Sequence, residues 1–252
     1  MSTTTTLPAP AALAGAELVL HGVRLGHPGT PPLFGALDLR VAPGEVLTVV
    51  GPSGCGKSTL LRTLAGLLPA LGGRVTQDGR AITRPDADRA LVFQHDALLP
   101  WRTARANVEL PLAIRRIPRD ERRRAAAEWL DRVDLSGHAT RLPHRLSGGQ
   151  RQRVQLARAL AGRPRCVLMD EPFGALDAHT RTGMQDLLVD ILGESGATVV
   201  FVTHDVDEAL HLGDRVALLA TGQVLPVPHP RQRDADQAPA TTALRRRVLA
   251  SL

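Results

Sequence analysis

Short apolar segments alternate with amphipathic segments over most of the chain. Five apolar segments, each four or five residues long, contain few polar positions. Such segments are typical of strands that a parallel sheet buries on both faces, and they are residues 46–50, 90–93, 166–170, 198–202 and 215–219. Helical patterns follow three of them, at residues 57–68, 178–192 and 206–211. Strands that alternate with helices predict an α/β fold with a mostly parallel sheet.

Three other segments alternate apolar and polar positions, as half-exposed strands do. They are residues 17–25, 37–41 and 73–80. The last of them contains Asp78-Gly79, a dipeptide that favours a tight hairpin turn. These segments predict an antiparallel β subdomain beside the parallel core.

From residue 95 to residue 161 the pattern changes to helix. Residues 104–113 and 119–133 are rich in Ala, Arg and Glu and poor in β-branched residues, which favours helices. They predict a helical insertion between two strands of the core. The chain therefore divides into a disordered lead-in (1–16), one domain (17–225) and a short tail (226–252) whose end is basic and amphipathic. Within the domain, residues 17–94 and 162–225 form the core, and residues 95–161 form a helical subdomain.

Composition excludes several classes of protein. The 252 residues contain no run of eighteen apolar residues, so we expect no membrane span. The only two cysteines, Cys55 and Cys166, fit a reducing compartment and not a disulfide scaffold. The net charge of +6 would suit nucleic acid, but six aromatic residues offer few stacking platforms. An anionic membrane face or an acidic partner is therefore the favoured use of the charge, and no nucleic acid is expected.

Residues 46–60 have the pattern of a strand, a glycine-rich loop and a helix start. The glycines allow the backbone to approach an anion closely, and the helix begins at Lys57, the only lysine in the chain. The spacing is G-x-x-x-x-G-K-[ST], which predicts a P-loop NTPase (RecA-like) core. Lys57 is expected to reach the β- and γ-phosphates, and the Ser58 hydroxyl to ligate Mg²⁺. The expected nucleotide-binding residues are Gly51, Pro52, Ser53, Gly54, Cys55, Gly56, Lys57, Ser58 and Thr59.

Two acids end the apolar segment 166–170. Ligands of α/β sheets bind where the strands end, so we expect Asp170 to hold Mg²⁺ and Glu171 to act as general base on the attacking water. Neighbouring side chains of a strand point in opposite directions. The end of the strand is where the two acids can separate into these two roles.

A second helix start also has the features of an anion site. Ser147 and Gln150 form a capping box, which is a sufficient structural explanation for those two residues. Gly148 and Gly149 lie in the first turn, where each costs about 1 kcal/mol relative to alanine, and a cap does not need them. They predict a second helix N-terminus that receives phosphate.

Taken together, these motifs show that the chain resembles the ATP-binding subunit of an ABC transporter from about residue 17 to residue 225. The matching marks are Walker A (51–58), the Q-loop Gln94, the signature (146–150), Walker B (166–170), Glu171, the D-loop (175–177) and the switch His204. The resemblance implies a head-to-tail dimer that holds two ATP molecules, with Mg²⁺, at its interface. Ser147 and Gly149 of one subunit would contact the γ-phosphate held by Lys57 of the other.

The resemblance implies roles for four more residues. Gln94 would ligate Mg²⁺ and connect the site to the helical insertion, His204 would contact the γ-phosphate and act in catalysis with Glu171, and Asp177 would cross the dimer interface. The family commonly stacks adenine on an aromatic residue, often Tyr, and this chain has no Tyr. His27 stands in the matching turn, and we expect it to stack on adenine; if it does not, adenine is held weakly.

Residues 92–102 are similar to the nitrate, sulfonate and taurine importer branch of the family. That branch implies a separate permease, a substrate-binding protein that delivers solute to it, and a location on the cytoplasmic face of the membrane. Leu98, Leu99 and Trp101 are expected to form an apolar patch for the permease, unless Trp101 is simply part of the core. The alternatives are a soluble ABC ATPase that acts on nucleic acid or ribosomes, and a P-loop kinase.

Cys55 lies inside the phosphate loop at a helix N-terminus, where the pKa of a thiol tends to fall. It is either a small loop residue or a site of oxidation-sensitive activity.

Overall fold

The computed structural model describes residues 14–94, 97–232 and 238–251. The predicted lead-in over residues 1–13 lies outside the described residues. Residues 14–16 are packed against the core: Ala16 is fully buried, and the Arg165 guanidinium donates to the carbonyl oxygens of Ala14 at 3.1 Å and Gly15 at 3.0 Å. The expectation that the lead-in extends to residue 16 is therefore wrong, because these contacts fix its last residues.

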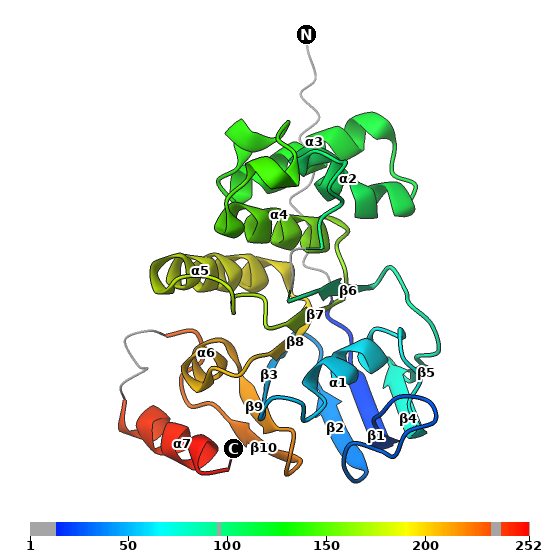
Figure 1. Cartoon of the computed structure of the whole chain (residues 1–252), viewed down its shortest axis with the longest axis vertical. Helices are drawn as coiled ribbons and strands as arrows, with labels where there is room; N and C mark the ends of the chain where they lie inside the picture. Colours follow the sequence, from blue (N-terminus) through cyan, green and yellow to red (C-terminus); the bar gives the residue numbers. More distant parts are fainter. Residues whose placement is uncertain (1–13, 95–96, 233–237, 252) are drawn as a thin grey trace.

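A six-stranded sheet forms the centre of the molecule (Figure 1). Its strands are β3 (Val46–Val50), β6 (Arg89–Val92), β7 (Cys166–Asp170), β8 (Thr198–Val202), β9 (Arg215–Leu218) and β10 (Gln223–Pro226). The order across the sheet is β10-β9-β3-β8-β7-β6, and all neighbours are parallel except β10. Every residue of β3 and β8 is buried, as expected for apolar strands in the middle of a parallel sheet. The predicted α/β fold is confirmed.

A smaller antiparallel sheet covers one side of this core. Its strands are β1 (Leu18–Arg24), β2 (Leu37–Val41), β4 (Gly72–Gln77) and β5 (Arg80–Ala81), in the order β2-β1-β4-β5. The turn between β4 and β5 has positive φ angles at Asp78 and Gly79, 49° and 75°, as the Asp-Gly dipeptide predicts.

Helix α1 (Lys57–Leu64) shares one apolar cluster with both sheets. We expected it to reach about Leu68. It ends earlier because Gly66 takes a φ of 77°, and the N–H groups of Leu67 and Leu68 turn back to the carbonyl of Arg62.

The helical insertion lies above the core in Figure 1. It consists of α2 (Ala104–Ile114), α3 (Arg119–Arg132) and α4 (Gly148–Ala161), with two short 3₁₀ turns, Ser136–His138 and Pro143–Arg145, before α4. The fully buried Leu130 and Val154 belong to one apolar cluster with Met184 of α5 (Ala178–Ser195). The insertion is therefore packed continuously onto the core, through α4 and α5.

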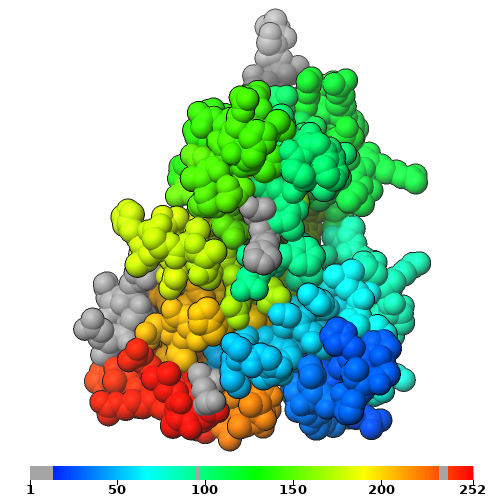
Figure 2. Space-filling model, in the orientation of Figure 1, coloured from blue at the N-terminus to red at the C-terminus, as the bar shows by residue number. Residues whose placement is uncertain are grey.

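The end of the chain, which we predicted as a short tail with a basic amphipathic end, folds back onto the core. Helix α7 (Pro239–Leu249) packs on α6 (Val206–Leu212), and the two lie beside each other at the lower left of Figure 2. Val248 is fully buried. Arg245 pairs with Asp207 through two contacts, 2.6 and 2.9 Å long. Among the described residues, no helix has the length and apolar character needed to cross a bilayer.

Candidate active site

The phosphate loop joins the buried end of β3 to the start of α1. Gly54 and Gly56 have φ angles of 81° and 101°, a region that side chains with a Cβ rarely occupy. The backbone N–H groups of Gly56, Lys57, Ser58 and Thr59 donate to no backbone carbonyl of the described residues. Free N–H groups at a helix start attract an anion, so the loop is built to receive phosphate.

The ammonium of Lys57 lies inside this loop. The side chain is only 6% exposed, and Nζ donates to the carbonyl oxygens of Gly51 at 2.8 Å and Pro52 at 3.1 Å. The nearest carboxylate oxygen is Oε1 of Glu171, at 3.8 Å. The two carbonyl groups are neutral and do not cancel the positive charge of the ammonium. The largely desolvated cation can therefore attract an anionic ligand strongly.

Ser58 and Asp170 meet although they are 112 positions apart in the sequence. The Ser58 hydroxyl donates to Oδ1 of Asp170 at 3.1 Å. Burial raises the pKa of the Asp170 carboxyl above its usual value, the hydrogen bond from Ser58 opposes this shift, and the charge of Glu171 adds to it. A hydroxyl beside a partly buried carboxylate fits Mg²⁺, which commonly takes one or two protein oxygens and completes its shell with phosphate and water.

Glu171 leaves the strand in a strained conformation. Its φ angle is 44°, which is uncommon for a residue with a side chain and is often found at functional sites. Its N–H donates to the carbonyl of Val202 at 2.9 Å, and Oε2 lies 2.9 Å from Nδ1 of His204. The two acids thus separate as predicted: Asp170 faces Ser58, and Glu171 faces His204 and Lys57.

The loop after β6 carries Gln94, whose side chain is exposed. Neither a hydrogen bond nor an ion pair among the described residues joins it to Ser58 or Asp170. The preceding residue is tied to the helical insertion, because Gln155 of α4 donates to the carbonyl of Phe93 at 2.9 Å.

Farther along this loop, the predicted apolar patch is only partly exposed. Trp101 is 72% exposed and is therefore not part of the core, whereas Leu98 is 7% exposed and packs in the interior. The patch prediction was wrong for Leu98. The fully buried Asn107, which we did not predict, fixes the backbone here: it accepts from the N–H of Leu99 at 2.8 Å and donates to the carbonyl of Arg102 at 3.0 Å.

The signature lies at the N-terminus of α4, in the predicted capping box. Gln150 N–H donates to Ser147 Oγ at 3.2 Å, and Ser147 N–H donates to Gln150 Oε1 at 3.0 Å. A Cβ on Gly148 would meet no atom within 4 Å, whereas one on Gly149 would lie 2.8 Å from the Thr180 methyl group. No hydrogen bond or ion pair of the described residues joins this helix start to the phosphate loop. Within one chain, therefore, the two anion-receiving helix starts remain separate.

The D-loop ends in Asp177, which caps α5. Its carboxylate accepts from the N–H and the hydroxyl of Thr180, at 3.0 and 2.7 Å. These hydrogen bonds lower the pKa of Asp177. The carboxylate is therefore held ionised at the surface.

A polar network supports the switch, and the sequence did not reveal it. Arg181 donates to the carbonyl of Leu176 at 3.0 Å and lies 3.6 Å from Asp205, the residue after His204. Asp205 in turn accepts from the N–H groups that begin α6. Arg181 therefore joins the D-loop to the switch segment; the only sequence signal was its place in the first turn after the D-loop.

The turn that carries His27 is exposed and is closed by Thr30, whose hydroxyl donates to the His27 carbonyl at 2.8 Å. No hydrogen bond or ion pair of the described residues joins His27 to the phosphate loop. Two apolar residues lie next to that loop. Leu33 is 45% exposed, and its Cδ1 would lie 2.8 Å from a Cβ on Gly56; Cε1 of the Phe34 ring would lie 3.4 Å from the same Cβ. Leu33 was not predicted; the only signal was an apolar residue in a turn rich in Gly and Pro.

Comparison with known proteins settles the family. The model of the family described as ABC transporter matches residues 34–174, more than half of the chain. The chain belongs to the ABC transporter family. The resemblance inferred from Walker A, the signature and the switch is thereby confirmed.

Relatives of this ABC chain include import proteins. It is 48% identical over 208 residues to the taurine import ATP-binding protein of Chromobacterium violaceum, a match that covers 82% of this chain and 80% of that protein. It is 49% identical over 207 residues to the nitrate import ATP-binding protein of Synechococcus elongatus, covering 78% of this chain but only 31% of that longer protein.

Solved ABC cassettes share the fold. The ATP-binding cassette MJ0796, in a dimeric post-hydrolysis state bound to ADP and Pi, is 35% identical to this chain with a TM-score of 0.74. The likeness covers 84% of this chain and 99% of that one.

Proposed function

We propose that this chain binds and hydrolyses ATP and thereby powers an ABC importer for a small anionic or zwitterionic solute of the nitrate, aliphatic sulfonate or taurine class. One observation carries the ATPase part. The helix start whose N–H groups donate to no backbone carbonyl of the described residues also bears Lys57 and Ser58. Ser58 contacts Asp170, Lys57 lies 3.8 Å from Glu171, and Glu171 contacts His204. The import names of the relatives support the transport part. None of the relatives reported above is named for nucleic acid, and no observation favours that alternative.

The residues of the site have separate tasks in this proposal. Lys57 and the N–H groups of the loop bind the β- and γ-phosphates of ATP, and the Ser58 hydroxyl and the Asp170 carboxylate hold the Mg²⁺ that neutralises phosphate charge. Glu171 accepts a proton from the attacking water. The His204 imidazole, 2.9 Å from Glu171, orients this carboxylate and contacts the γ-phosphate.

The proposal includes a dimer, because no hydrogen bond or ion pair of the described residues joins the signature helix to the phosphate loop of its own chain. The exposed start of α4 has open space over Gly148 and would bring its N–H groups to the γ-phosphate of a second copy. ATP would then join the two copies, and its hydrolysis would release them. The dimeric form of the cassette MJ0796 supports the association of two copies.

Light scattering on the Glu171→Gln protein tests the dimer. We expect MgATP to double its mass. The further change Ser147→Glu should abolish the doubling, because it places a negative charge against the γ-phosphate. Ser136→Glu changes an exposed serine of the same subdomain and should leave the dimer intact. A Glu171→Gln protein that stays monomeric with MgATP, alone and with its permease, would refute the arrangement.

We further propose that Trp101 docks the permease on the cytoplasmic face of the membrane and that a substrate-binding protein delivers the solute to that permease. Trp101 is 72% exposed and is displayed by a loop that Asn107 holds. Trp101→Arg should abolish co-purification with the permease from solubilised membranes and leave the ATPase rate in solution unchanged. Leu249→Arg, at a half-exposed position of α7, is the matched control. Equal recovery of the permease with both variants would contradict the docking site.

A further inference from the structure

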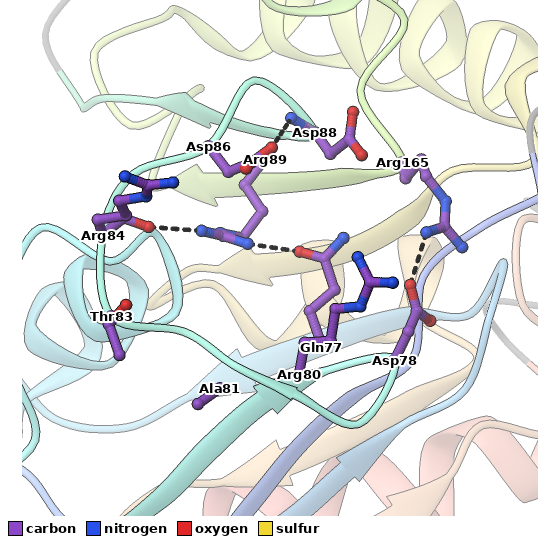
Figure 3. Close-up of a pocket in the computed structure, with 10 residues that line it drawn as sticks. All are labelled: Gln77, Asp78, Arg80, Ala81, Thr83, Arg84, Asp86, Asp88, Arg89 and Arg165. Atoms are coloured by element: carbon purple, nitrogen blue, oxygen red, sulfur yellow. Dashed lines mark hydrogen bonds and ion pairs between the residues drawn. The ribbon is translucent and has the colours of Figure 1, made fainter.

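A polar cavity opens where strands β6 and β7 of the central sheet begin. The phosphate loop lies at the opposite end of the sheet, where the strands end. The cavity has a volume of about 530 Å³. It lies between the β4–β5 hairpin and the first residues of β6 and β7 (Figure 3), whereas the phosphate loop follows the last residue of β3. Four of the ten residues that line it are arginines: Arg80, Arg84, Arg89 and Arg165. Neither the hydrolysis of ATP nor the proposed transport uses this cavity.

The carboxylates of the cavity are largely neutralised already. Asp78 forms an ion pair of 2.6 Å with Arg165. Asp88 pairs at 2.9 Å with Arg115, which reaches it from α2. Only Asp86 has no guanidinium within ion-pair distance among the described residues, and one of its oxygens accepts from the N–H of Asp88 at 2.9 Å.

The remaining arginines have no carboxylate partner in the part of the chain that the structure describes. Arg89 is held by two neutral acceptors, the side-chain oxygen of Gln77 at 2.6 Å and the carbonyl of Arg84 at 2.7 Å. The guanidinium groups of Arg80 and Arg84 make no hydrogen bond or ion pair with the described residues. In Figure 3 the Arg80 and Arg89 guanidinium groups approach Gln77 from opposite sides. Three guanidinium groups without a carboxylate partner thus line the cavity, whereas Asp86 is the only carboxylate of its lining that has no ion pair with the described residues.

We propose that this cavity binds a small soluble molecule that carries a phosphate group with two or more negative charges. Guanidinium groups present paired N–H donors that match phosphate oxygens, and such contacts are stronger than neutral hydrogen bonds. Arg89 is already oriented by Gln77, so it loses little freedom on binding. A volume of about 530 Å³ suits a metabolite or a nucleotide. The ligand would connect the hairpin to the parallel core without competing for the phosphate loop.

Calorimetric titration tests the site with pyrophosphate as the probe. The protein is first saturated with the magnesium complex of a non-hydrolysable ATP analogue, so that the phosphate loop is already occupied. We expect one saturable site per chain, with an affinity about tenfold weaker in the Arg80→Gln/Arg84→Gln protein. Both side chains are exposed, so the variant should fold, and the single variant Arg84→Gln gives an intermediate value.

The control is Arg74→Gln, which removes an exposed arginine from β4 outside the cavity and should leave the affinity unchanged. The absence of saturable heat would overturn the proposal. So would a loss of pyrophosphate affinity in the Arg74→Gln protein equal to the loss in the Arg84→Gln protein, because binding would then follow net charge alone.

Vesicles of phosphatidic acid in phosphatidylcholine distinguish a lipid phosphate from a soluble one. Wild-type and Arg80→Gln/Arg84→Gln proteins should sediment with these vesicles equally. A smaller sedimented fraction for the double variant would overturn the assignment to a soluble ligand.

Discussion

Glutamine at position 171 would remove one negative charge from the catalytic centre and keep the shape of the side chain. Glu171 is 18% exposed, and its oxygens lie 2.9 Å from His204 Nδ1 and 3.8 Å from Lys57 Nζ. The two contacts use different oxygens, Oε1 for Lys57 and Oε2 for His204. An amide keeps one oxygen, places an NH₂ group in the position of the other, and accepts no proton from water. ATP hydrolysis should therefore slow by about 10²–10⁴-fold, which raises the barrier by about 3–5 kcal/mol. Folding should persist, since the charge of Glu171 raises the pKa of Asp170 and its loss relieves that repulsion.

Phosphate release at saturating MgATP measures the rate of the Glu171→Gln protein, and polarisation of a fluorescent ATP analogue measures its affinity. We expect the affinity to stay within about threefold of the wild-type value, because a general base contributes to the transition state and not to ground-state binding. Glu128→Gln, an exposed change on α3, should alter neither quantity. A rate within about tenfold of wild type would refute the assignment of Glu171 as general base.

Three other predictions follow from burial and charge. Burial raises the folded-state pKa of Asp170 above its usual value of 3.8, so the ionisation of Asp170 costs stability that increases as pH rises from 3.8 through the folded-state pKa. Asp170→Asn should therefore raise the melting temperature of the nucleotide-free protein more at pH 8 than near pH 4, and should abolish Mg²⁺-dependent ATP binding; an equal rise at both pH values would contradict this. Val248→Ala should lower the free energy of unfolding by about 1–3 kcal/mol in urea titrations, because it removes two buried methyl groups. Leu249→Ala, at a half-exposed position, should lower it by less than about 0.5 kcal/mol; equal losses of unfolding free energy would mean that α7 does not pack in solution. His27→Ala should weaken ATP binding by about 2–10-fold if the imidazole stacks on adenine, and a larger loss in Leu33→Ala would instead assign the base contact to the leucine beside Gly56.

The central strands were predictable because packing leaves them little choice of residue. β3 and β8 consist almost entirely of β-branched and large apolar residues, which suit a strand buried on both faces. β10 and α7 were missed for the opposite reason. Pro226 and Pro228 interrupt the apolar residues of this segment, so it gives no strand pattern. Helix α7 is held by Val248, which lies in an apolar cluster with residues of α6, and by the ion pair of Arg245 with Asp207. No local pattern predicts such a long-range contact.

The site shows the same division. The phosphate loop has a fixed spacing because the backbone itself forms the anion site, so Lys57 and Ser58 could be identified one by one. The polar network that supports the switch could not be predicted in this way. Arg181 and Glu208 are ordinary polar residues of helices in the sequence, and only the fold brings Arg181 to Asp205 and buries Glu208 against Gln185. The pKa of Glu208 rises because of this burial, which no spacing reveals.

The hydrogen bond between Ser58 and Asp170 has a consequence for the order in which ligands arrive. The two groups satisfy each other at 3.1 Å, so a solitary Mg²⁺ would have to break this bond and shed water in exchange for one carboxylate. The same ion already chelated by a triphosphate brings its own anionic ligands and has less to lose. The protein should therefore ignore millimolar magnesium salts and capture the preassembled metal–nucleotide complex in a single event.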